Sequence, residues 1–490
     1  MKRLNNQTLT QLPAQIQRPG YDRSSITPGI LHFGVGAFHR SHQALTIDRL
    51  LSQGLAQDWG IVGVCLLPND YMMRDALIPQ DCLYTLLTKH SDGTRDFQVI
   101  GSIIDFLFAP DNPQMVINKL TDPAIRIVSL TITEGGYSFD RVTGEFDPTT
   151  PGVADDLLNT TSPKSAFGFI LEGLKLRRAN GIPPFTIQSC DNIQGNGDVA
   201  KKMITAFAKL IDPELAIWIE ENVAFPNAMV DRITPRTAKG DIEVVQNETG
   251  IEDYCPVVCE PFFQWVIEDY FPLGRPPFEK ASVQMVEDVL PYEIMKLRLL
   301  NASHQGLCYF GRLSDYIYVH EVMQDPLIEQ LLRRYMDEEA TPTLRPIPDI
   351  DLAAYKNQLI ERFSNPHVQD TVARLAAESS DRIPKWLIPV VRELLEKSMK
   401  VNLSAAIVAS WARYDEGVDE HGELINVVDP LKDELMEIAK SQKENPKAFI
   451  ENRKLFGDLA TDSRFADPYL SALSSLHEKG AQETLKELLK

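Results

Sequence analysis

Four polar side chains with complementary chemistry stand in one short stretch of the sequence: Glu293, Lys296, Asn301 and His304. On an α-helix, at about 100° per residue, they fall within an arc of about 140° that also carries Leu300. A lysine on such a partly apolar face can act as a general base, because desolvation disfavours its charged form. An amide can stabilise a developing alkoxide, and an imidazole can orient a hydroxyl. The spacing therefore indicates acid–base chemistry at a carbinol or carbonyl; a solvated polar face with ordinary ion pairs is the alternative.

A glycine-containing turn indicates a site for a dinucleotide. The sequence reads GVGAFHR directly after an apolar segment. Two glycines between a strand and a helix permit a tight turn and let the backbone approach a pyrophosphate closely. A histidine replaces the third glycine of the usual fingerprint, so a plain strand-to-helix turn stays open as the alternative. The candidate cofactor contacts in this turn are Gly34, Val35, Gly36, Ala37, Phe38, His39 and Arg40.

A carboxylate beyond the next predicted strand indicates which cofactor the turn would bind. Asp70 stands where a ribose 2′-hydroxyl is usually held, and its charge would repel a 2′-phosphate. Its spacing from Gly36 exceeds the usual distance of about 20 residues, so an enlarged first crossover is expected. The nearest basic residue is Arg74. We predict NAD rather than NADP; an ordinary turn residue is the alternative interpretation of Asp70.

Polar residues also follow other apolar segments in the first part of the chain. The segment TITEGGY suits a loop at the carboxyl edge of a sheet, where doubly wound folds bind ligands. Asn192 closes another predicted strand, and Asp231 is expected in a loop bounded by prolines. The TITEGGY loop adds three cofactor candidates, Thr133, Glu134 and Gly135.

Metal ligation is not predicted. His39 and His42 lack the glutamate and the spacing of an HExxH motif, so contacts at the surface or with phosphate are expected for them. The six cysteines are sparse, and the pair Cys255 and Cys259 has no second pair at zinc-site spacing. We expect the cysteines to be small buried hydrophobic residues rather than nucleophiles.

Strands that alternate with helices are expected to position these residues. The predicted strands span 29–33, 59–65, 125–133 and 185–189, and the predicted helices span 43–51 and 163–180. This order predicts a doubly wound α/β domain that binds the dinucleotide over residues 1–290. Long helical periods then predict a mostly α-helical domain for substrate binding and catalysis over residues 291–490.

The composition excludes several functional classes. The 490 residues include 49 Lys and Arg against 69 Asp and Glu, a formal net charge of −20. A chain with this excess of negative charge has no electrostatic basis for binding nucleic acid or an anionic membrane. No apolar run approaches the roughly 18 to 20 residues that span a bilayer, and the first residues lack the apolar stretch of a signal peptide. We expect a cytoplasmic protein without nucleic-acid or membrane partners.

Several of these segments together resemble the polyol-specific long-chain dehydrogenases, the mannitol dehydrogenase family. The similar segments are GVGAFHRSHQA, TITEGGY, SCDN, FPNAMVDRITP, CEPFFQWVIED and the helix that contains Lys296, Asn301 and His304. Weaker similarity continues into RFSNP and the later helices. The resemblance implies a Rossmann-type N-terminal domain, a helical C-terminal domain and a monomeric, zinc-independent enzyme.

The resemblance also implies a reaction, the NAD-dependent oxidation of D-mannitol at C2 to D-fructose, and its reverse. Lys296 matches the general base of the family. Asn192 and Asn301 match the pair that stabilises the alkoxide or carbonyl oxygen. His304 matches the residue that orients the substrate, and Glu293 matches a carboxylate that relays the proton towards solvent.

Three residues match contacts with the substrate's hydroxyl groups: Asp231, Arg374 and Arg382. The family position matched by Arg382 is a lysine, so the charge is kept but the geometry differs. Uronate reductases of the same family act on fructuronate or tagaturonate, whose carboxylate would require an arginine partner such as Arg374 or Arg382. Sorbitol and arabinitol are further candidate substrates, since they differ from mannitol by only a few hydrogen bonds.

Two other functional classes remain as alternatives. A non-catalytic dinucleotide-binding sensor would not need a base beside the nicotinamide, so the combination of Lys296, Asn301 and His304 argues against it. A metal-dependent sugar isomerase or lyase would need a cluster of carboxylates and histidines that the sequence does not show. Loss of activity on chelation would favour that class.

Overall fold

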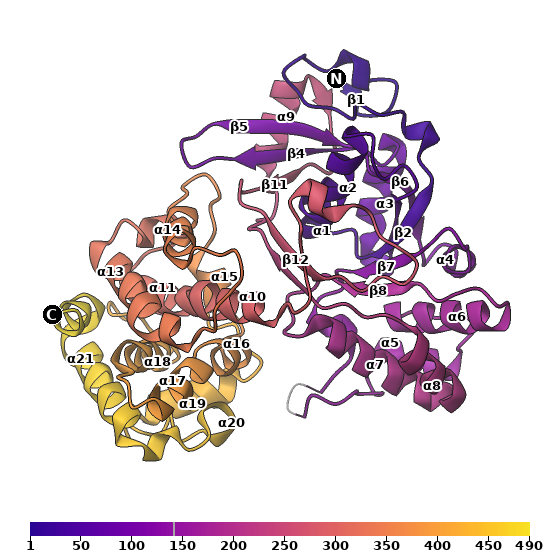
Figure 1. Cartoon of the computed structure of the whole chain (residues 1–490). Coiled ribbons are helices and arrows are strands. Elements are labelled where there is room, and N and C mark those ends of the chain that lie inside the picture. The colour runs from indigo at the N-terminus through magenta and orange to yellow at the C-terminus, as the bar shows by residue number, and fades with distance from the viewer. Residues whose placement is uncertain (141–142) are drawn as a thin grey trace. The chain divides into compact units, whose positions relative to one another are not determined.

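The computed structural model describes residues 1–140 and 143–490 (Figure 1). The chain divides into two compact units, Met1–Leu290 and Pro291–Lys490. Figure 1 shows strands and helices in the first unit and helices in the second. Among the described residues, no helix is long and apolar enough to cross a membrane.

A five-stranded parallel sheet organises the first unit. Its strands lie in the order β6 (Ile103–Phe108), β3 (Gly60–Cys65), β2 (Pro28–Phe33), β7 (Ile127–Leu130) and β8 (Thr186–Ser189). Every neighbouring pair is parallel. Strand β2 comes first in the sequence and lies in the middle, so the chain winds outwards from it in both directions. The predicted doubly wound sheet is confirmed, and its switch point lies between β2 and β7.

Alternate residues of the central strands pack into two separate hydrophobic clusters. Leu31 and Phe33 of β2 belong to one cluster, and Ile30 belongs to the other. Successive side chains of a strand point to opposite faces, so both faces of this sheet are covered. The first cluster includes side chains of α4 (Pro113–Leu120), α6 (Ala166–Ala179) and α7 (Asn196–Ile211), and the second includes side chains of α2 (Gln43–Ser52).

Strand β7 is shorter than the apolar run that predicted it. The run continues to Thr133, but the strand ends at Leu130. The N–H groups of Ile132 and Thr133 donate to the carboxylate of Asp191 instead of continuing the ladder, at 3.2 and 2.8 Å. Thr133 has a φ of +61°, which a β-branched residue adopts only under constraint. The loop after β7 is therefore held by a side chain rather than by a neighbouring strand.

The prediction that Asp231 lies in a loop is wrong. It is the last residue of β9 (Ala228–Asp231), which pairs antiparallel with β12 (Gln264–Glu268). The prolines that bound this segment flank the strand rather than interrupt it, because its apolar residues are buried. The same sheet contains β13 (Gln284–Val286), and another contains β11 (Val257–Cys259), β4 (Tyr84–Lys89) and β5 (Arg95–Ile100).

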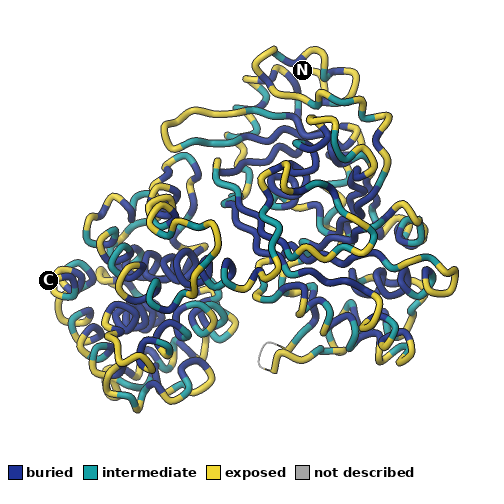
Figure 2. The backbone as a smooth tube through the Cα atoms, viewed as in Figure 1, coloured by how far each residue is buried: buried dark blue, intermediate teal, exposed yellow. Residues whose placement is uncertain are grey.

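The second unit is built of helices, as predicted. The helices α11 and α18 are buried along almost their whole length, and Figure 2 shows them in the dark blue of buried backbone. The main helices are α10 (Leu290–Met295), α11 (Ala302–Leu313), α13 (Pro326–Arg334), α14 (Leu352–Phe363), α15 (Val372–Ala376), α16 (Ser379–Trp386), α17 (Ile388–Glu396), α18 (Asn402–Tyr414), α19 (Lys432–Ser441) and α21 (Ser463–Leu488).

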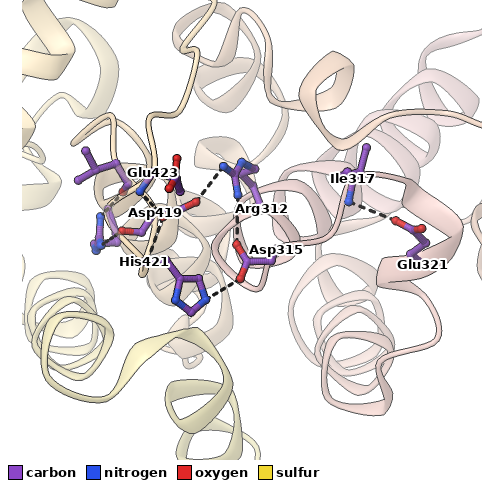
Figure 3. A network of polar contacts seen from close by, with 9 residues as sticks. Arg312, Asp315, Ile317, Glu321, Asp419, His421 and Glu423 are labelled. Carbon is purple, nitrogen blue, oxygen red and sulfur yellow. Dashed lines mark hydrogen bonds and ion pairs between the residues drawn. The ribbon is translucent and has the colours of Figure 1, made fainter.

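A polar network fixes the far end of α11 (Figure 3). The guanidinium of Arg312, in the last turn of this helix, pairs with Asp419 at 3.0 Å and with Asp315 at 3.5 Å. The other oxygen of Asp315 pairs with His421 at 2.7 Å. The N–H groups of His421 and Glu423 donate to the second oxygen of Asp419, at 3.0 and 2.8 Å. These contacts connect the end of α11, the helix that carries His304, to the loop that contains Asp419 and His421.

Candidate active site

A π-helical segment interrupts the helix that carries the candidate base. The π-helix η7 (Lys296–Asn301) lies between α10 and α11, and the Ala302 N–H donates to the Leu297 carbonyl five residues earlier. Uniform α-helical spacing is therefore wrong for this stretch. Residues five apart lie about one turn apart in a π-helix, whereas an α-helix would separate them by about 140°. The irregular turn brings Lys296 and Asn301 onto one face, and such turns are frequent at functional sites.

The polar side chains of this helix are buried. Glu293, Lys296, Asn301 and His304 are each less than one-tenth exposed. The Oδ1 atom of Asn301 has no hydrogen-bond partner among the residues that the structure describes. Buried polar atoms are almost always bonded, so this atom marks a place for a polar ligand atom. Turning the amide exchanges its oxygen and nitrogen, so the same point can offer either an acceptor or a donor.

The imidazole of His304 is held neutral. Burial lowers its pKa well below 6.5, and the nearby positive charges of Arg374, Arg362, Arg382 and Lys296 lower it further. Its ring packs against Phe363 with 4.7 Å between the ring centres. A neutral imidazole donates through one nitrogen and accepts through the other, which suits the orientation of a hydroxyl group.

The two arginines predicted to bind substrate lie near His304 but already have partners. Arg374 holds the carboxylate of Asp370 at both oxygens, with its Nε atom 2.6 Å from Oδ1. Arg382 donates to the Arg374 and Leu375 carbonyls at 3.3 and 3.1 Å and pairs with Glu378 at 3.4 Å. Both cations are thus partly neutralised by carboxylates that lie just before the helices carrying them.

Contacts from neighbouring helices hold the π-helix. The hydroxyl of Tyr335 donates to the Arg298 carbonyl at 3.1 Å. The guanidinium of Arg298 donates to the Thr343 carbonyl at 2.8 Å and to Glu393 at 2.5 Å. Tyr335 itself begins a second π-helix, η8 (Tyr335–Ala340), which packs against η7. Sequence reasoning did not find these supports, because none of them shares a motif with Lys296.

In the first unit, the glycine turn has the geometry that the sequence predicts. Gly34 has a φ of +93°, and a Cβ atom there would lie 2.1 Å from the Thr131 carbonyl oxygen. A Cβ atom on Gly36 would meet nothing closer than 3.9 Å. Gly34 is therefore required by the turn itself, whereas Gly36 leaves the backbone open to a ligand just before α1 (Ala37–Ser41).

The side chains of His39, Arg40 and His42 are buried in the fold, contrary to the surface or phosphate contacts expected for the two histidines. Both histidines are fully buried, and His39 stacks on His32 with 3.4 Å between ring centres. The guanidinium of Arg40 donates to the Cys255 carbonyl. The reason is packing, since α1 and α2 bury these rings against neighbouring strands. The parts of the turn open to solvent are Gly34, Gly36, Ala37 and Phe38.

Asp70 follows β3 in a short 3-10 helix. One of its carboxylate oxygens accepts a hydrogen bond from the Leu67 N–H at 3.0 Å, and the side chain stays partly exposed. The nearest cation, Arg74, is paired with Asp75 and Asp111, each at 2.8 Å. A guanidinium held by two carboxylates is poorly placed to bind a 2′-phosphate, so these contacts agree with the predicted preference for NAD.

Asp191 ties together two loops of predicted site residues, and the sequence analysis missed it. Its carboxylate accepts hydrogen bonds from Ile132 and Thr133, and from the Tyr137 hydroxyl at 2.8 Å. Tyr137 also contacts Ser189 Oγ at 2.5 Å. Asp191 directly precedes Asn192, so one carboxylate fixes both the Thr133 backbone and the segment that carries Asn192. Its place within SCDN was the available signal.

Asp191→Asn is expected to weaken dinucleotide binding about tenfold at pH 7, because the amide cannot accept all three hydrogen bonds. Burial raises the pKa of Asp191 from 3.8 to about 6, against the opposing effect of those bonds. The wild-type carboxylate therefore protonates as the pH falls through about 6, and dinucleotide affinity should fall with it. Fluorescence titrations of NADH at pH 7 and pH 5 measure both effects.

The matched control is Asp198→Asn, which changes an exposed carboxylate of α7 and should leave both affinities at wild-type values. The variant at position 191 should lose the pH step. An Asp191→Asn protein that binds NADH like the wild type at both pH values would contradict this role.

The remaining candidates lie in the first unit. Asn192 is exposed after β8, and Asp231 is buried at the end of β9. Glu134 and Gly135 lie in a 3-10 helix after Thr133, and a Cβ atom on Gly135 would meet nothing within 4 Å. Asn192 and the Thr133 loop lie close together, because Asp191, the residue before Asn192, accepts a hydrogen bond from the Thr133 N–H.

The described cysteines are free thiols, and all of them are buried. Burial raises the pKa of each of these thiols, to about 12 for Cys65 and Cys82, which is unfavourable for a nucleophile. Within residues 1–140 and 143–490, no group of three or more His, Cys, Asp or Glu side chains is arranged to hold a metal ion.

Comparisons with known proteins cover nearly the whole chain. The model of the mannitol dehydrogenase Rossmann domain matches residues 28–280, and that of the mannitol dehydrogenase C-terminal domain matches residues 288–477. The mannitol 2-dehydrogenase of Aspergillus fumigatus is 43% identical over 498 residues, covering 99% of each chain. The Pseudomonas fluorescens mannitol 2-dehydrogenase, solved as a ternary complex with NAD and D-mannitol, is 44% identical with a TM-score of 0.90 over 99% of each chain. A substrate-free D-sorbitol dehydrogenase is 38% identical with a TM-score of 0.91, over 98% of this chain and 100% of that one.

Proposed function

This chain belongs to the mannitol dehydrogenase family and is an NAD-dependent polyol dehydrogenase, and we propose that it oxidises D-mannitol at C2 to D-fructose with Lys296 as the general base. The reaction needs no metal ion in this proposal. The reverse reduction uses the same residues. Family membership supports the polyol and the cofactor, whereas the lysine mechanism rests on the site in the second unit.

The residues of the first unit fit NAD. The open backbone at Gly36 allows a pyrophosphate to approach, and Asp70 suits a ribose 2′-hydroxyl. Arg74 is occupied by two carboxylates, so it offers little to a 2′-phosphate. When bound, NAD supplies the acceptor for the hydride from C2.

The side chains perform the proton chemistry. The Lys296 amine accepts the proton of the C2 hydroxyl, and the amides of Asn192 and Asn301 donate to the oxygen as negative charge develops. One O–H bond and one C–H bond break while the carbonyl double bond forms, and the hydride carries two electrons to the cofactor. Glu293 passes the proton from Lys296 towards solvent. In the reverse direction the protonated Lys296 returns it.

The observation that carries this proposal is the π-helical turn. It sets Lys296 and Asn301 on one face, where the buried Oδ1 atom of Asn301 has no partner among the described residues, three positions before the neutral His304. A sensor that only binds NAD would gain nothing from an irregular helix that orients a base and an amide. The buried base, amide and imidazole together therefore favour catalysis over sensing.

The arginine contacts favour a neutral polyol over a uronate. A uronate carboxylate needs an uncommitted cation, but Arg374 already donates from Nε and Nη2 to the two carboxylate oxygens of Asp370. Arg382 is shared between main-chain carbonyls and Glu378. Their remaining N–H groups suit hydroxyl oxygens, which carry no charge. Sorbitol remains a second candidate, because a D-sorbitol dehydrogenase is 38% identical to this chain.

The purified protein with NADH and fructose is expected to consume NADH rapidly, whereas fructuronate in a parallel assay should give little turnover. NADPH should be a poor substitute, because Asp70 repels its 2′-phosphate. Prior treatment with EDTA should leave the rate unchanged.

Rapid turnover with fructuronate alone would reassign the substrate. Loss of activity on chelation, restored by metal, would contradict the lysine mechanism. Mannitol and sorbitol with NAD, compared by kcat/KM, decide between the polyols.

A further inference from the structure

A small cavity lies inside the first unit, against α1, the helix that follows the glycine turn. Its volume is about 10 Å³, measured as the space open to the centre of a water-sized sphere. This is about the least space that holds one water molecule. Of its five polar side chains, Ser129 of β7 already bonds the His32 ring at 2.8 Å. The other four come from four different elements: His39 of α1, Gln43 of α2, Gln188 of β8 and Trp265 of β12.

The polar atoms of these side chains lack partners. Both ring nitrogens of His39, the Oε1 atom of Gln43, the Nε2 atom of Gln188 and the Nε1 atom of Trp265 form no hydrogen bond with any described residue. All four residues are at most 4% exposed, so bulk water does not reach these atoms. Native proteins leave few such groups unsatisfied. Their convergence on one cavity indicates a common partner.

We propose that this cavity is a binding site for one ordered water molecule that fastens the dinucleotide turn to the sheet. A water molecule accepts two hydrogen bonds and donates two. Here it accepts from the Trp265 and Gln188 N–H groups and donates to Gln43 Oε1 and to one nitrogen of His39. The four directions of a water molecule are thereby used.

Other small occupants fit the site less well. A metal cation or an ammonium ion cannot accept a hydrogen bond, but the indole N–H of Trp265 can only donate one. An anion would need a positive charge in the wall. Burial lowers the pKa of His39 well below 6.5, and the neighbouring His32 and Arg40 lower it further, so its ring is neutral. A neutral molecule that both donates and accepts fits this wall, and the volume limits it to water.

The water would act on the cofactor site through His39. This residue lies in the helix that follows Gly36, and its ring stacks on His32. The ring of His32 is bonded to the Gly34 carbonyl and to Thr131, at 3.1 and 2.9 Å. One water molecule therefore links the turn and its histidine stack to Gln188 and Trp265, on strands distant in the sequence. The effect on the cofactor rests on the proposed function, whereas the water itself does not.

A crystal structure of the wild-type protein at a resolution that shows ordered solvent tests the site directly. We expect one well-ordered water within hydrogen-bonding distance of His39, Gln43, Gln188 and Trp265. An empty cavity, or side chains rearranged to bond one another across it, would overturn the proposal. This outcome does not depend on whether the protein turns over mannitol.

Gln188→Leu tests the link to the turn, because leucine nearly keeps the volume but removes the donor. We expect the water to be lost or disordered in its crystal structure and the Kd for NADH to rise about tenfold, with kcat at saturating NADH unchanged. The control is Gln264→Leu, a buried glutamine beside Trp265 that does not line the cavity; it should bind NADH normally.

If Gln188→Leu does not fold, Trp265→Phe removes the other donor and should give the same result. An unchanged Kd for NADH in the variant that folds would overturn the role in the turn. A wild-type protein that does not bind NADH would instead refute the proposed function.

Discussion

Lys296→Ala is expected to lower turnover about 10²- to 10⁴-fold in both directions while NADH binding stays near the wild-type value. This is the range that general acid–base catalysis contributes. The expected separation follows from the chain's organisation, since the candidate cofactor residues lie in the first unit and Lys296 in the second. The substitution removes an amine from a buried face of the π-helix and leaves the glycine turn untouched.

Steady-state rates with mannitol and with fructose, together with NADH titrations, measure the two effects of Lys296→Ala. Added methylamine should restore part of the activity, because a small amine can replace the missing base. Lys440→Ala, at an exposed lysine of α19, is the control and should keep wild-type rates. Near-normal turnover in Lys296→Ala would refute the lysine mechanism. A large loss of NADH binding would point to a structural role.

The sequence predicts the architecture of the first unit well because its signals are strong and local. Segments such as GILHF and IVSL are buried on both faces of the sheet. A parallel strand buried in this way appears in the sequence as a nearly continuous apolar run. Gly34 is equally readable, since only glycine fits a positive φ so close to the Thr131 carbonyl. The position of the glycine turn therefore follows from short-range physics.

The direction of the side chains in that turn does not follow from short-range physics. His39 and Arg40 belong to a motif that indicates ligand contacts, yet both are buried by partners far along the chain, such as Cys255 and Trp265. Asp231 lies in a strand for a similar reason, because its partner Gln264 is distant in the sequence. Long-range pairing decided these three placements.

The π-helix marks the limit of sequence reasoning at the candidate site. Helical spacing grouped Lys296, Asn301 and His304 as one set, but it assumed 3.6 residues per turn throughout. Two contacts from outside stabilise the extra residue in this turn. Tyr335 of another helix donates to the Arg298 carbonyl, and the Arg298 guanidinium donates to Glu393. No local residue preference in the segment KLRLLN predicts the π-helical turn. The geometry that matters for the chemistry is thus a tertiary property of the second unit.

Asn301→Ala is expected to lower kcat about 10²- to 10³-fold, the usual effect of removing one donor to a developing oxyanion. The physical reason is that the buried Nδ2 group of this amide donates to the oxygen as negative charge develops; its Oδ1 atom has no partner among the described residues, so turning Nδ2 towards the substrate breaks no hydrogen bond of Oδ1. The KM for mannitol should change less than kcat, because the interaction strengthens as the oxygen becomes negative. Asn301→Asp should be at least as slow, since a carboxylate repels the alkoxide and attracts the proton of Lys296.

Ser303→Ala provides the matched control for Asn301→Ala. Ser303 lies two residues further along the chain, about 200° round the helix and so on the opposite side from Asn301. It is fully buried, and its Oγ atom also has no partner among the described residues. Its loss removes an unpaired hydroxyl and should leave both kcat and KM at wild-type values. Thermal unfolding of all three variants separates catalysis from folding. An Asn301→Ala protein with normal kcat, or a Ser303→Ala protein that is equally slow, would show that the buried amide does not act on the substrate oxygen.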